Sequence, residues 1–218
     1  MICIVPIMGH GTVGKDYVVD KITHRLKNAG VCAEIMYFDT SKSAKEIIDG
    51  FATPNGYQHG NEKLYSELGC KGDSYRNALV SIINGLDMLD IRLYETMHNI
   101  ESYISILRNR DQRADIIFFL NIRDTAFVKK LKDIYEPRGY AFRCLIVVDG
   151  EGRTPEYKDT PLDNKEYEQG LTTALKADDI AYYQYVNDDD ASSESFDNDA
   201  KQIREFYRLL TKKDFKEE

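Results

Sequence analysis

The sequence has no tryptophan, few prolines, four cysteines and no apolar run long enough to cross a membrane. The cysteines, at positions 3, 32, 70 and 144, form no C-x-x-C pair, which favours reduced thiols in a core over disulfides. The N-terminal apolar stretch, residues 2–8, is shorter than the apolar region of a signal peptide and runs straight into glycines. These absences predict a cytoplasmic protein.

Basic residues are outnumbered, with 29 Lys and Arg against 37 Asp and Glu, for a formal net charge of −8. Such a chain lacks the broad basic surface that binding to a polyanion requires. We therefore exclude nucleic acids and anionic membranes as main partners. A small phosphorylated ligand stays compatible with this charge because a few local cations can hold it. We expect a monomer or a homodimer.

Apolar runs alternate with amphipathic segments along the 218 residues. Strands are predicted at 2–8, 31–38, 115–122, 141–148 and 180–186, and helices at 15–27, 41–51, 125–135, 164–176 and 196–210. This alternation predicts one α/β domain over residues 1–218, with a largely parallel five-stranded sheet flanked by helices. Residues 149–163, with two glycines and two prolines, are predicted to form a polar loop.

The stretch 73–110 is predicted to be mostly helical, with an interruption near Asn84 and Gly85. Its second part carries apolar residues at alternating three- and four-residue steps, a pattern typical of a helix face in a core. These residues are Leu86, Leu89, Leu93, Met97, Ile100, Ile104 and Leu107.

The most specific motif is G-x-x-x-x-G-K, which directly follows the first predicted strand and opens the first predicted helix. It reads Gly9-His10-Gly11-Thr12-Val13-Gly14-Lys15, followed by Asp16. Glycines let backbone N–H groups curl around a phosphate, and the helix N-terminus adds partial positive charge. The lysine can then reach the β- and γ-phosphates of a nucleotide. The motif therefore predicts a phosphate-binding loop.

Two residues of this motif leave alternatives open. Asp16 stands where Ser or Thr usually binds Mg²⁺, and its carboxylate could hold the ion through water. Equally, it could be an acid favoured by the helix dipole. His10 could touch phosphate or occupy a variable position. The four histidines are scattered, and no Ser-His-Asp set or metal-ligand cluster competes with the loop.

Gly14-Lys15-Asp16 in place of G-K-S/T resembles the deoxynucleoside monophosphate kinases of phages and related bacteria, and also animal phosphomevalonate kinases. Three further segments resemble that family more weakly. The predicted apolar strand that leads into residues 121–124 is similar to a family strand followed by a charged motif, and Val186-Asn187-Asp188 is similar to the family segment near the adenine of the nucleotide. Residues 71–76 are similar to a charged helix start in a bacterial branch of these kinases. The resemblance implies a P-loop NTPase fold of the nucleoside monophosphate kinase type, with ATP and Mg²⁺ as cofactors.

The resemblance also implies roles for individual residues. Residues 39–110 would be a helical acceptor-binding insertion, and 149–163 a lid-like loop. The loop residues Gly9, His10, Gly11, Thr12, Val13, Gly14, Lys15 and Asp16, with Tyr17 and Asn187, would bind the donor nucleotide, and Asp16 the metal. Lys15 and Arg123 would be catalytic, and Lys45, Arg76 and Arg153 would bind the acceptor. Each arginine, and Lys45, could instead be a solvated surface charge.

The residues after the third predicted strand bear on catalysis. Asn121 stands where many members of the family carry an acid that orients the metal, and Asp124 could supply that carboxylate instead. Arg123 should face the ligand crevice that opens at the carboxyl ends of parallel strands. If it is buried there, it requires an anion, either phosphate or a carboxylate such as Asp124 or Asp149. The functions left open are a nucleoside monophosphate kinase, a kinase for another phosphorylated metabolite, and a nucleotide-binding regulator without turnover.

Overall fold

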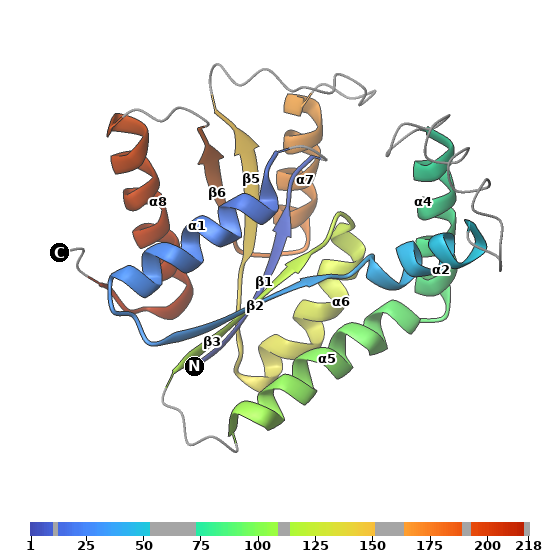
Figure 1. Ribbon diagram of the computed structural model, residues 1–218, viewed down its shortest axis with the longest axis horizontal. Coiled ribbons are helices and arrows are strands. Elements are labelled where there is room, and N and C mark those ends of the chain that lie inside the picture. The colour runs from blue at the N-terminus through green and yellow to red at the C-terminus, as the bar shows by residue number, and fades with distance from the viewer. Residues whose placement is uncertain (11–12, 53–72, 109–113, 151–163, 189–192, 216–218) are drawn as a thin grey trace. The chain divides into compact units, whose positions relative to one another are not determined.

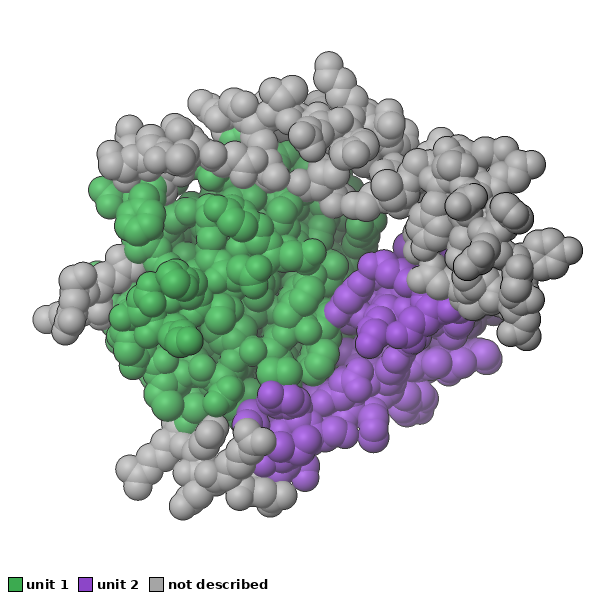
Figure 2. All heavy atoms as spheres, viewed as in Figure 1, with its two compact units in different colours: residues 1–38, 111–218 green, residues 39–110 purple. Residues whose placement is uncertain are grey.

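The computed structural model describes residues 1–10, 13–52, 73–108, 114–150, 164–188 and 193–215 (Figure 1). Contacts divide the chain into two compact units (Figure 2). Unit 1 comprises Met1–Phe38 and Asp111–Glu218, and unit 2 comprises Asp39–Arg110. Unit 2 covers the residues expected to form an acceptor-binding insertion, a role that stays a prediction.

A six-stranded sheet has the order β2-β3-β1-β5-β6, and β4 also pairs with β1. The strands are β1 (Ile2–Met8), β2 (Ala33–Asp39), β3 (Asp115–Asn121), β4 (Ala141–Phe142), β5 (Cys144–Asp149) and β6 (Tyr182–Asn187). β1 is parallel to β3, β4 and β5, and β5 is parallel to β6. The predicted parallel α/β fold is confirmed.

The strand predicted at 141–148 is divided in two, and Pro6 explains the division. Ala141 pairs with Cys3 and Leu145 with Ile7, so β4 and β5 share one register along β1. Between them, the Arg143 N–H donates to the Ile4 carbonyl at 3.2 Å. The next bond of a parallel ladder would require an N–H at position 6, and proline has none.

Two layers of helices cover the sheet. Odd-numbered strand residues such as Val5, Phe119 and Val147 form a core with apolar residues of α1 (Lys15–Asn28) and α8 (Ser193–Thr211). Because side chains alternate along a strand, even-numbered residues face the other side. There α6 (Thr125–Tyr135) contacts β4 and packs against α7 (Asn164–Ala177). The short 3₁₀ helix η2 (Glu136–Arg138) directly follows α6 in the chain.

Ionic contacts fix the amino end of β3, the edge of the sheet opposite the loop. The buried Asp115 carboxylate accepts hydrogen bonds from the Met1 amino group at 2.8 Å, Lys213 Nζ at 2.7 Å and the Tyr207 hydroxyl at 3.0 Å. Burial alone would raise the pKa of Asp115, but these hydrogen bonds outweigh it and lower that pKa. The cluster stabilises the fold away from the candidate site.

Unit 2 contains α2 (Lys42–Ala52), α4 (Asp73–Met88) and α5 (Ile91–Arg108). The predicted interruption near Asn84 and Gly85 is wrong, because α4 continues through both residues. The chain breaks instead at Leu89-Asp90, where Asp90 adopts a φ of 53°, which aspartate tolerates better than most residues.

The apolar stripe predicted in unit 2 is only partly buried. Ile100, Ile104 and Leu107 lie in the core, whereas Leu89, in the break, is 69% exposed. Among the described residues, no helix is long and apolar enough to cross a bilayer.

Candidate phosphate-binding site

The loop lies where the connections of the sheet diverge. From β1 the chain passes through α1 to β2, and from β5 it passes through α7 to β6, on the opposite side of the sheet. β1 and β5 are neighbours, so their carboxyl ends form the type of switch point at which open parallel sheets bind ligands. The turn after β1 begins at this point.

Two glycines in the turn adopt conformations that other residues avoid. Gly9 has a φ of 142°, and a Cβ on it would lie 2.5 Å from the Val147 carbonyl oxygen and 2.9 Å from Val13 Cγ1. Gly14 is left-handed, with φ 77° and ψ 38°, and is the N-cap of α1. Because glycine carries no capping side chain, the first N–H groups of α1 depend on other partners, such as an anion.

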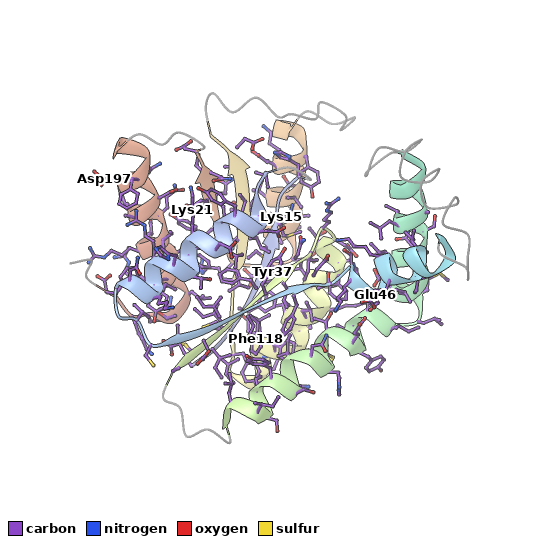
Figure 3. All side chains as sticks on the ribbon, in the orientation of Figure 1. Lys15, Lys21, Tyr37, Glu46, Phe118 and Asp197 are labelled. Carbon is purple, nitrogen blue, oxygen red and sulfur yellow. The ribbon has the colours of Figure 1, made fainter. Side chains whose placement is uncertain are left out.

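Lys15 opens α1 and folds back onto the turn. Its Nζ donates to the carbonyl oxygens of Gly9 at 3.0 Å and His10 at 2.7 Å, and the residue is only 6% exposed. Figure 3 labels it at the start of α1. The structure therefore places a cation inside the turn, as a phosphate-binding loop requires.

The sequence missed the partner of His10. Its Nε2 lies 2.6 Å from Asp149 Oδ2, and the histidine is buried. Asp149 ends β5, the strand beside β1. Only the strand order reveals this pair, because the residues lie 139 positions apart.

Asn187, predicted to lie near the adenine, is fully buried and bonded to the loop. Its Nδ2 donates to the Val13 carbonyl oxygen at 2.9 Å. The Val13 side chain belongs to the core of unit 1, so a contact between Val13 and a ligand would use its backbone. The adenine role of Asn187 stays a prediction.

Asp16 and Tyr17 are both exposed at the first turn of α1. The Asp16 carboxylate accepts a hydrogen bond from the Tyr37 hydroxyl of β2, and Lys21 Nζ lies 4.7 Å from the centre of the Tyr17 ring. Tyr37 thus orients the one loop carboxylate that could act through a metal.

We predict that Asp16→Asn raises the Mg²⁺ concentration needed for half-maximal ATP binding or turnover by about tenfold, as loss of a group orienting metal-bound water does. Titrating Mg²⁺ at fixed ATP measures this. Asp20→Asn is the control, because it removes the same charge from an exposed position one turn along α1. Identical Mg²⁺ curves for wild type and Asp16→Asn would leave Asp16 as a dipole-favoured acid.

Arg123 comes shortly after β3 and is exposed, so burial does not force an anionic partner on it, and its catalytic role stays a prediction. Burial raises the pKa of the Tyr167 hydroxyl, and the positive charge of Arg123 partly offsets that rise. The rival carboxylates have other contacts. Asp124 accepts from the Ala126 N–H at 2.9 Å as the N-cap of α6, and Asp149 contacts His10.

Of the residues predicted to bind the acceptor, the structure describes the side chain of Lys45 alone. Lys45 Nζ donates to Asp39 Oδ2 at 2.5 Å. Burial would raise the pKa of Asp39, but hydrogen bonds from Lys45 and Ser41 lower it overall. The backbone of Arg76 lies in α4, but its side chain is not described. The predicted site residues Gly11, Thr12 and Arg153 lie outside the described residues.

No known family matches the sequence, and no curated protein matches it either. Among solved structures, a de novo designed protein of PLOOP2X3_50 fold has a TM-score of 0.41 and 9% identity, covering 96% of this chain and 95% of its own. A designed P-loop NTPase fold has a TM-score of 0.37 and 11% identity, covering 95% and 91%. Shikimate kinase from Bacteroides thetaiotaomicron has a TM-score of 0.30 and 10% identity, covering 95% and 98%.

Proposed function

We propose that the protein binds ATP·Mg at residues 9–16 and transfers its terminal phosphoryl group to a small acceptor, with a nucleoside or deoxynucleoside monophosphate as the first candidate. The observation that carries the proposal is Lys15, whose ammonium group is held on the Gly9 and His10 carbonyls inside a glycine turn. An ammonium group held in a glycine turn at a helix N-terminus lies beside backbone N–H groups that favour an anion, so a polyphosphate is a suitable ligand.

Phosphoryl transfer requires cations around a spreading negative charge, alignment of the reacting oxygens and exclusion of water. Lys15 and Arg123 would supply protein cations in unit 1. Among the described residues, no group of three or more His, Cys, Asp or Glu side chains is arranged to hold a metal. Mg²⁺ would therefore be held mainly by the nucleotide phosphates and water, with Asp16 acting on its water shell.

The acceptor is proposed from the resemblance to monophosphate kinases. Lys45 and Arg76 of unit 2, and Arg153 of the segment 149–163, would contact its phosphate. Lys45 is partly exposed beside Asp39, and the pair would have to rearrange for the ammonium group to meet an acceptor. A different phosphorylated metabolite would use the same cations.

A second candidate, nucleotide binding without turnover, is favoured by the residues after β3. Asn121 ends that strand with an amide in place of a carboxylate, and the Asp124 carboxylate caps α6. Neither arrangement provides an obvious acid for orienting the metal, whereas nucleotide binding would be unaffected.

A screen of nucleoside and deoxynucleoside monophosphates with ATP·Mg, scored by ADP release, tests the proposal. A second panel of non-nucleotide phosphorylated metabolites separates the two kinds of kinase. Calorimetric titration with ATP·Mg runs in parallel. ATP binding without ADP release from any acceptor would support the regulator, and absence of ATP binding would refute both candidates.

We predict that Arg123→Lys lowers turnover by about tenfold or more, equivalent to about 1.4 kcal/mol of transition-state stabilisation. Lysine keeps the charge but loses the guanidinium fork that matches phosphate oxygens. Because Arg123 is exposed, the melting temperature should hardly change. Arg208→Lys, an exposed position in the last turn of α8, is the control. A large loss of stability with normal turnover of the folded fraction would make Arg123 a structural residue.

A further inference from the structure

Two residues at the ends of neighbouring strands hold the loop on both sides of residues 11–12. Asp149 of β5 and Asn187 of β6 are partners in the parallel register. Their side chains therefore lie on the same face of the sheet. Asp149 contacts the His10 side chain at 2.6 Å, and Asn187 donates to the Val13 carbonyl at 2.9 Å.

The contact with His10 extends to the proposed phosphate-binding cation. Lys15 Nζ donates to the His10 carbonyl at 2.7 Å, so the position of the His10 backbone helps to fix the ammonium group. Asp149 anchors the same residue through its ring. A shift of His10 away from β5 would move a carbonyl to which Lys15 is bonded.

The strand ends that carry the two residues are themselves braced. Gln202 of α8 accepts from the Val186 N–H at 2.7 Å and donates to the Val186 carbonyl at 3.1 Å, which ties the end of β6 to α8. The Gly150 N–H donates to the Asn187 carbonyl at 3.1 Å. Asn187 thus sits on a backbone held from two sides.

The hydrogen bonding of Asn187 points to a role in the loop. Its side chain is fully buried, and its Oδ1 has no hydrogen-bond partner among the described residues. A buried acceptor without a partner is unfavourable, and an apolar residue of similar size would avoid that penalty. The amide differs from such an apolar residue by its Nδ2 hydrogen bond to the Val13 carbonyl, so this bond explains why an amide suits the position.

We propose that Asp149 and Asn187, here termed the loop clasp, are positioning residues that preset the phosphate loop for the anion. The inference rests on the proposed function, because it assigns the clasp to the same loop. A loop already held in its binding conformation loses less entropy when a ligand binds, which increases affinity. The clasp acts through His10 and Val13 and does not itself touch phosphate.

The test uses Asp149→Ala and Asn187→Ala with ATP·Mg as the probe in calorimetry. Each variant should raise the Kd by about tenfold, equivalent to about 1.4 kcal/mol. Asp149→Asn keeps an oxygen that can accept from His10 and should restore most of the affinity. Equal weakening by Asp149→Asn and Asp149→Ala, or wild-type affinity in both alanine variants, would overturn the proposal.

Tyr185→Phe is the matched control on β6, because it keeps the aromatic ring in the core and removes only the buried hydrogen bond of 2.6 Å from the Tyr185 hydroxyl to Asp199. It should lower the melting temperature and leave the Kd unchanged. Amide hydrogen exchange of residues 13–18, measured without nucleotide, tests the loop clasp separately from the proposed ATP-binding function. Faster exchange in the alanine variants than in Tyr185→Phe supports the clasp even if wild type fails to bind ATP, which would refute only the proposed function. Exchange no faster than in Tyr185→Phe would overturn the clasp.

Discussion

Lys15→Ala is expected to reduce phosphoryl transfer by about 10²–10³-fold, the range seen when one preorganised donor to a developing charge is removed. ATP·Mg binding should also weaken. The ammonium group has two effects that alanine loses together. It attracts the polyphosphate, and it holds the Gly9 and His10 carbonyls at 3.0 and 2.7 Å. Calorimetry with ATP·Mg and the ADP-release assay measure the two losses separately.

Two further variants show whether charge or packing causes the loss. Lys15→Met keeps the buried apolar stem and removes only the charged group, so it should match Lys15→Ala in binding and turnover while unfolding less readily. Lys27→Ala removes an exposed charge from the other end of α1 and should behave as wild type. Unchanged kinetics in both Lys15 variants would contradict a phosphate-binding role for the loop.

The loop was predictable because its parts are adjacent in the sequence. Gly9, Gly14 and Lys15 fall within one turn, and the structure places that turn between β1, which ends at Met8, and α1, which begins at Lys15. The two contacts that anchor the loop join residues 139 and 174 positions apart. They depend on β5 lying beside β1 and β6 beside β5, and periodicity predicts strands without their order.

The errors in predicted elements have local causes. Pro6 lacks an N–H donor, but its effect falls on the strand paired with β1, so β4 and β5 could not be separated without the register. In unit 2, α4 tolerates Asn84 and Gly85 and ends at Met88. Asp90 breaks the helix, and the guanidinium of Arg92 bridges the break by bonding Asp87 Oδ1 at 2.7 Å and Oδ2 at 2.5 Å.

Arg123 shows a different limit. Its position after an apolar strand was predicted from the sequence, and β3 ends at Asn121, two residues before it. Burial at that position could not be inferred, because it depends on which side chains surround the strand end. The exposed guanidinium removes the argument from desolvation, so its role now depends on the kinetic test alone.

Gly9→Ala should destabilise the fold by about 3 kcal/mol or more, from backbone strain and a steric clash together. The φ of 142° is one that residues with a side chain rarely adopt, and the new Cβ would lie 2.5 Å from the Val147 carbonyl oxygen. Relief would require β1 and β5 to separate where the loop begins. The melting temperature should therefore fall by roughly 6–12 °C, at about 2–4 °C for each kcal/mol in a chain of this size.

Gly30→Ala distinguishes strain from the clash. Gly30 has a φ of 66°, but a Cβ there would meet nothing within 4 Å, so the variant carries the strain alone and should cost about 1 kcal/mol. The additional loss of stability in Gly9→Ala, compared with Gly30→Ala, then measures the effect of the close approach of the loop to β5. Because that approach also sets where the turn starts, folded Gly9→Ala should bind ATP·Mg more weakly than Gly30→Ala does. Equal melting temperatures and equal affinities for the two variants would mean that Gly9 does not contact β5 as closely as the structure shows.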